Sequence, residues 1–167
     1  MALSGSIAGG FGIGGALIAY TSGADGVMRF AFFVGASLLL AAIFLSLAAA
    51  IAASTDTRAI ALSVGTFAWF FFVLLYDAAT LAVAGWLTGS VGGRVLFASV
   101  FGNPADLIRV AILSVSGTPH VLGAAGEAWL RFLGGAPAAT ATCVGVLAVW
   151  TVAPLAIAVR AIGARDL

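Results

Sequence analysis

The sequence predicts an all-α membrane protein with four transmembrane helices and short re-entrant or interfacial helices before the last span. The chain has 167 residues, of which 63% are hydrophobic and only 8% are charged, whereas a soluble domain carries about 25% charged residues. Its mean hydropathy of +1.21 leaves no stretch polar enough for a separate soluble domain. We therefore expect residues 1–167 to form a single multi-pass domain in the cell (plasma) membrane.

Four apolar runs are long enough to cross about 30 Å of hydrocarbon as helices that rise about 1.5 Å per residue. The predicted spans are Leu3–Thr21, Phe30–Ala53, Ile60–Trp86 and Ala138–Val159. The links at 22–29 and 54–58 are short, so the first three spans should be antiparallel neighbours. We expect these three spans to form one compact bundle.

The segment before the last span, residues 87–137, is still largely apolar but is interrupted by glycines and prolines. We predict short helices over about 104–116 and 124–133, both too short to cross a bilayer. Asn103 is a good N-cap, Pro104 suits the first helical position, and Asp106 falls on the first turn, where the helix dipole favours an anion. Backbone that enters a membrane without crossing it must be buried in protein or line a cavity. We interpret these helices as an external cap over a pathway.

One acidic residue, Asp77, lies deep in the third span, in a run with no other charge. A carboxylate at a helix centre costs about 2.5 to 3.5 kcal/mol on insertion scales, so it normally has a partner or a task. One interpretation is a structural lock to an arginine of the cap, with Arg109 as the first choice. The other is direct contact with a substrate moving along a pathway.

The charges are few and scattered, with a formal net charge of +1. The absence of a basic patch argues against nucleic acid as a partner. Arg109 and Arg131 each have an acid within one helical turn and are poor indicators of topology. The other arginines favour the side of Arg58 and the carboxyl terminus as the cytoplasmic one under the positive-inside rule. We predict that both termini and the loop at Asp56 are cytoplasmic.

The residues argue against several chemistries. A haem bundle needs axial ligands on facing helices, and an intramembrane serine protease needs a paired Ser and His. The only histidine is His120, beside a proline in the cap segment, so neither is supported. Copper relays use clustered Cys, Met or His, but Cys143, Met28 and His120 lie far apart in sequence. We therefore predict no catalytic residue, no metal site and no cofactor in this chain.

The residues also resemble a known family, the permease subunits of ABC exporters of the second type, in particular the NosY-type permeases of nitrous oxide reductase maturation. The resemblance rests on Thr57-Arg58-Ala59 entering a span that ends in Phe-Phe-Val-Leu-Leu-Tyr-Asp77, on Asn103-Pro-Ala-Asp-Leu-Ile-Arg109, and on a last span with an arginine-bearing tail. It covers essentially the whole chain and implies the last four spans of a six-span permease. The chain would then lack the first two spans and the coupling helix between the second and third, and it resembles a truncated permease or one portion of a split one.

The resemblance implies a function and partners. Two permease copies would pair and move a substrate through a dimeric helical bundle, driven by a separate ATPase subunit that holds the ATP and Mg. It further implies a contact of the ATPase with the loop at Asp56 and Arg58, an external accessory protein, and a role in maturation of the copper enzyme nitrous oxide reductase. The alternative is a small non-transporting membrane anchor or assembly factor whose cap binds a partner.

Overall fold

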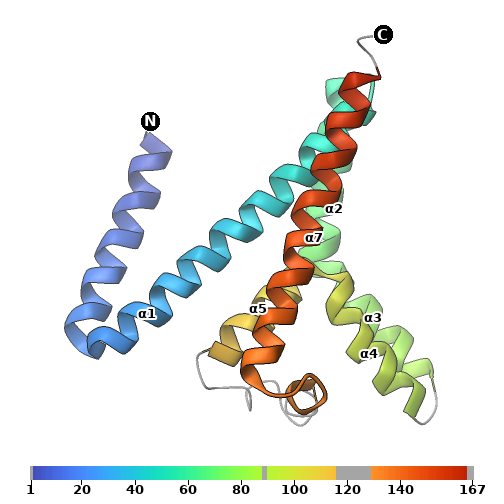
Figure 1. The fold of residues 1–167 in the computed structure, drawn as a ribbon. Helices are drawn as coiled ribbons and strands as arrows, with labels where there is room; N and C mark the ends of the chain where they lie inside the picture. Colours follow the sequence, from blue (N-terminus) through green and yellow to red (C-terminus); the bar gives the residue numbers. More distant parts are fainter. Residues whose placement is uncertain (1, 88–89, 116–128, 165–167) are drawn as a thin grey trace. The chain divides into compact units, whose positions relative to one another are not determined.

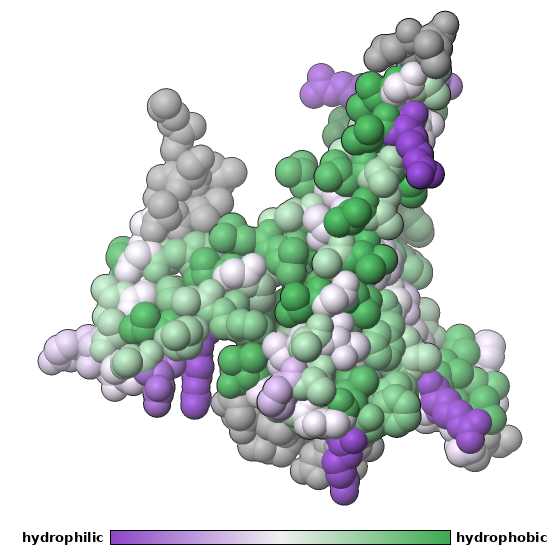
Figure 2. Space-filling model, in the orientation of Figure 1, coloured by the Kyte–Doolittle hydropathy of each residue, from purple (hydrophilic) through white to green (hydrophobic). Residues whose placement is uncertain are grey.

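The computed structural model describes residues 2–87, 90–115 and 129–164, with only the backbone of residues 2–8. Every element within these ranges is helical and no strand occurs in them, as the sequence predicts for an all-α membrane protein (Figure 1). Hydrophobic side chains cover most of the visible surface, and hydrophilic ones lie near the ends of helices (Figure 2). The exposed apolar side chains include Phe67, Trp86 and Val149, which is the composition expected of a surface in contact with lipid.

The chain divides into two units, Met1–Leu38 and Leu39–Leu167. The first unit belongs to helix α1, Ala2–Ser54, which is interrupted at Gly23 with φ 63° and ψ −155°. Only glycine adopts this conformation cheaply. The two arms fold back on each other, so that the rings of Phe11 and Phe30 have centroids 6.3 Å apart. The predicted loop at 22–29 is therefore wrong, because one glycine makes the turn and residues 24–29 remain helical.

The second unit contains the end of α1 and all later elements. The predicted third span, Ile60–Trp86, corresponds to Arg58–Trp86 in the structure, which is composed of α2 (Arg58–Phe70), a π-helical turn η1 (Phe71–Leu75) and α3 (Tyr76–Trp86). Thr57 caps α2 by accepting a 3.3 Å hydrogen bond from the backbone N–H of Ile60. The last span is α7, Ala136–Gly163. Its buried residues include Ala139, Cys143 and Leu147, four residues apart, so one stripe of the helix faces the protein.

Two shorter helices, α4 (Ser90–Gly102) and α5 (Pro104–Val115), lie between these spans and are bent by 96° relative to each other. At 13 and 12 residues, each is roughly 20 Å or less in length and cannot cross the hydrocarbon alone. Helix α4 returns along α3, and α5 packs along α7 (Figure 1). In the described ranges, Gly9–Ser54, Arg58–Trp86 and Ala136–Gly163 are long and apolar enough to span, and the bent pair would be a fourth.

The sequence does not predict helix α4, because Gly92 and Gly93 are among the glycines that interrupt the segment 87–137. The structure gives a different reason for Gly92, where a Cβ would lie 2.7 Å from the carbonyl oxygen of Ala84. Gly92 therefore allows α4 to approach α3 closely. The predicted cap helix at 124–133 lies in part outside the described residues, as does His120, and only 129–132 are described as helical.

Candidate functional site

The break between α4 and α5 lies beside the middle of the two long helices Arg58–Trp86 and Ala136–Gly163. It is contacted by Phe72, halfway along Arg58–Trp86, and by Trp150, halfway along Ala136–Gly163. Each helix end leaves backbone groups without a partner inside the helix. Such groups are costly within a membrane unless protein or water satisfies them. The chain therefore needs polar side chains at this point, and we call the residues 99–105 the hairpin tip.

Asn103 satisfies one side of the hairpin tip. It is only 1% exposed, and its Oδ1 accepts a 3.0 Å hydrogen bond from the backbone N–H of Ala105 at the start of α5. Its Nδ2 donates a 3.0 Å hydrogen bond to the carbonyl of Phe72 in the π-helical turn. A π-helical turn shifts the hydrogen-bond register of a helix and is frequent at functional sites. One side chain thus caps α5, as predicted, and also ties it to the third span, which was not predicted.

Two aromatic side chains satisfy the end of α4. The hydroxyl of Tyr76 donates a 2.8 Å hydrogen bond to the carbonyl of Ser99, and Nε1 of Trp150 donates one of 3.1 Å to the carbonyl of Phe101. A Cβ on Gly102 would overlap the Tyr76 hydroxyl. The tip therefore depends on a glycine where a side chain of another helix reaches the backbone.

A charged cluster lies next to the tip. Nη1 of Arg109 is 2.9 Å from Oδ1 of Asp106 and 3.2 Å from Oδ2 of Asp77. The structure thus brings Asp77 and Arg109 together, although Asp106, one helical turn away, is the nearer partner of the arginine. The side chains of Arg109, Asp77 and Asp106 are 55%, 41% and 15% exposed. With both carboxyls ionised the cluster carries a net charge of −1.

A cavity of about 230 Å³ adjoins this cluster and is formed by α3, α4 and α5. It is lined by Asp77, Thr80, Leu81, Leu96, Ser99, Val100, Asp106, Arg109 and Val110. Within the described residues, Oδ1 of Asp77 is buried and has no hydrogen-bond partner. A polar atom in this position is costly in a membrane. Asp77 therefore has one carboxylate oxygen and an adjoining cavity that are not used by its ion pair with Arg109.

Other predicted site residues lie elsewhere. Asp56 and Arg58 are exposed at the turn from α1 to α2. In Figure 1 this turn lies at the same end of the second unit as the end of α7. The structure does not bring them to the charged cluster. The described part of the predicted second cap helix also contacts α4. Trp129, which is not one of the predicted site residues, is 4% exposed, and its ring centroid lies 6.0 Å from that of Phe97 and 5.7 Å from that of Phe101.

Sequence reasoning identified Asn103, Asp106 and Asp77 but missed the aromatic donors Tyr76 and Trp150. The available signal was a tyrosine directly before the acid of the third span and a tryptophan halfway along an otherwise apolar last span. Tyrosine and tryptophan usually find a hydrogen-bond partner when they are buried. Within the described ranges, no three metal-ligating side chains come together.

These features define a multi-pass α-helical membrane protein with a polar, bent helix pair inside its bundle. No protein-family model matches the chain, and no solved structure matches it. Over 82 residues the chain is 40% identical to a protein of Pseudomonas aeruginosa named "Probable ABC transporter permease protein NosY". The match covers 49% of this chain and 30% of the relative, so it spans less than a third of that protein. This similarity supports a permease-like relationship for about half of the chain.

Proposed function

We propose that this chain is a non-catalytic, membrane-spanning permease subunit of an ABC transporter. The observation that carries the proposal is the 40% identity over 82 residues to an ABC permease. The polar hairpin tip supports it, because broken helices at mid-depth are tolerated where they line a cavity or are buried in protein. A simple anchor has no need of a bent helix pair whose ends require three side-chain caps.

The charged cluster has a specific role in this proposal. Arg109 on α5 contacts Asp77 on α3, whereas the rest of α5 packs chiefly on α7. The ion pair is therefore a polar link between α5 and α3 and acts as a lock in one conformation. Transport requires at least two states in which such contacts differ. When the ion pair opens, Asp77 would be free to face the adjoining cavity. Asp77 would then serve both as a structural lock in one state and as a contact for the substrate in the other.

The finer parts of the proposal rest on the resemblance of the sequence to NosY-type permeases. They are a second permease copy, a separate ATPase that contacts the loop at Asp56 and Arg58, an external accessory protein, and a substrate of nitrous oxide reductase maturation. ATP and Mg would be held by the ATPase. The cytoplasmic location of both termini also belongs to this proposal, with the start of α4 and the start of α7 outside.

Affinity purification from mild detergent tests the proposal. We expect a P-loop ATPase to co-purify with the tagged chain, and expect Asp56→Ala together with Arg58→Ala to reduce its amount at least fivefold without changing the membrane level of the chain. Arg94→Ala, on the exposed face of α4, is the matched control. Purification of the chain without any ATPase, from cells that contain its natural partners, would overturn the permease proposal and favour an anchor.

A further inference from the structure

A second hollow in the structure has no part in the site described above. It is an open groove of about 520 Å³ within the second unit, between the last part of α1 and α2. The groove exists because small residues line it on both helices, and their short side chains do not fill the space between the two backbones. The small residues are Ala48 and Ala52 on α1 and Ala61, Gly65 and Ala68 on α2.

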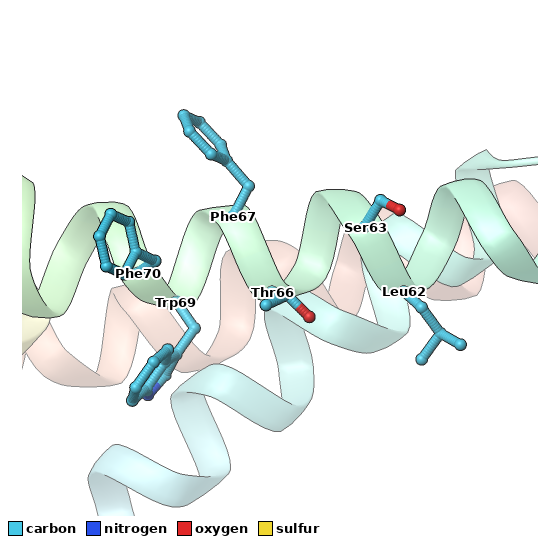
Figure 3. Close-up of a pocket in the computed structure, with 6 residues that line it drawn as sticks. All are labelled: Leu62, Ser63, Thr66, Phe67, Trp69 and Phe70. Carbon is cyan, nitrogen blue, oxygen red and sulfur yellow. The ribbon is translucent and has the colours of Figure 1, made fainter.

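The groove lies on a face of α2 that has little cover. No residue of α2 is buried, and larger apolar side chains such as Leu62 and Trp69 form the walls of the groove. In Figure 3, Leu62 and Trp69 point to one side of α2 and Phe67 points to the other. Because α2 is the first half of a helix long and apolar enough to span a membrane, we expect the hydrocarbon of the bilayer to reach this groove.

The length of the groove corresponds to one leaflet. It extends along α2 from Arg58, the first helical residue, to Trp69. At about 1.5 Å per residue this is roughly 16 Å, about half of the ~30 Å hydrocarbon thickness. A single acyl chain that enters from one leaflet would therefore fill it end to end.

The mouth of the groove carries a positive charge. Arg58 lines it and is exposed, and among the described residues Arg58 takes part in no ion pair. A guanidinium group binds phosphate through paired hydrogen bonds and carries its charge at every relevant pH. Among the described residues that line the groove, Thr66 carries a hydroxyl and Trp69 an indole N–H, and the others apart from Arg58 are apolar. A groove that is apolar along its length and charged at one end, at Arg58, is suited to bind an amphiphile.

We propose that this groove binds an anionic phospholipid, with one acyl chain between α1 and α2 and the phosphate on Arg58. Acyl chains gain little by moving from bilayer to groove, since both are apolar. Selectivity therefore comes from the headgroup. In an anionic lipid such as phosphatidylglycerol, no cation of the headgroup lies beside the phosphate, so the phosphate interacts fully with the arginine. In a zwitterionic lipid, the ammonium group of the headgroup competes with the arginine for the phosphate. The occupant is a lipid and not a second copy of this chain, because a lipid matches both the charge and the leaflet depth.

Native mass spectrometry of the purified full chain tests the proposal with two probes, dioleoyl phosphatidylglycerol and dioleoyl phosphatidylcholine at equal concentrations. We expect about fivefold more phosphatidylglycerol to remain bound, the preference that one basic residue gives near an anionic surface. Arg58→Gln should remove this preference. Arg160→Gln, an exposed arginine near the end of α7, should keep it.

A second variant tests the groove itself. A Cβ on Gly65 meets no atom within 4 Å, and Gly65 lines the groove, so Gly65→Leu should occupy the groove and reduce binding of both lipids at least fivefold. Gly145→Leu on α7 also meets no atom within 4 Å and is the control. Wild-type lipid binding by Arg58→Gln or Gly65→Leu would overturn the proposal, as would an equal loss in Arg160→Gln. A change from dimer to monomer caused by Gly65→Leu alone would assign the groove to a second copy instead.

Discussion

Substitutions in the charged cluster should destabilise the protein by different amounts, depending on which member is replaced. Arg109 is the single cation for two carboxylates, at 2.9 Å from Asp106 and 3.2 Å from Asp77. Arg109→Gln would leave both carboxylates facing each other without a cation. Asp77→Asn would leave a neutral pair of Asp106 and Arg109 and an amide that still accepts a hydrogen bond. We therefore expect loss of the arginine to be the more damaging change.

The magnitudes follow from burial. Removing one partner of a buried ion pair costs about 3 to 5 kcal/mol. Arg109→Gln would leave the carboxylate of Asp106, which is only 15% exposed, without its cation, so we expect the lower limit, about 3 kcal/mol, for this change. Loss of a half-exposed partner costs about 1 kcal/mol, which we expect for Asp77→Asn. The double variant removes the repulsion between the two carboxylates and should cost about 2 kcal/mol in total.

The free energy of unfolding can be measured by titrating the purified chain with dodecyl sulfate in mixed micelles and following its helix content. The double variant should be about 2 kcal/mol more stable than additive single effects would make it. Arg94→Gln, on α4 and outside the cluster, should have little effect. If the two single losses add to within about 0.5 kcal/mol, the ion pair does not stabilise the fold. Direct contact of Asp77 with a substrate would then be the better interpretation.

Three further changes test the hairpin tip and the topology. Asn103→Ala should cost about 3 kcal/mol of unfolding free energy in the same titration, because it removes a helix cap and leaves a buried carbonyl without its donor; a loss below about 1 kcal/mol would contradict this. Gly102→Ala should lower the thermal midpoint through its clash with the Tyr76 hydroxyl, and adding Tyr76→Phe should recover part of the loss, whereas no recovery would locate the strain elsewhere. Gly93→Cys, where a Cβ meets no atom within 4 Å, should react in a Cys143→Ala background with an impermeant thiol reagent outside intact cells, and reaction only after lysis would invert the proposed topology.

The class of protein and the long helices could be predicted from the sequence because they depend on local properties. A run such as Ile60–Trp86 has no water to satisfy its backbone in a bilayer, so it must form its own hydrogen bonds as a helix. The N-cap at Asn103 and the proline after it are equally local signals. The meeting of Asp77 with Arg109 was also inferred, since an isolated charge in a membrane requires a partner.

The tertiary structure alone decided how the short helices are arranged. Gly92 appears in the sequence as a break, but it lies inside α4 and permits close contact with α3. Gly23, by contrast, makes a complete turn where a longer loop was expected. A glycine permits a turn, a break or a close approach, and only the neighbouring helix determines which of these occurs.

The sequence by itself determined that Asn103 caps a helix and that Asp77 needs a partner. It did not determine that the same Asn103 side chain binds the carbonyl of Phe72, or that Tyr76 and Trp150 satisfy the end of α4. These bonds join residues 23 to 49 positions apart in the chain. Their partners are backbone carbonyls, which every residue possesses, so no pattern of residue types marks them in advance. Only the packing of the helices selects which carbonyl each donor reaches.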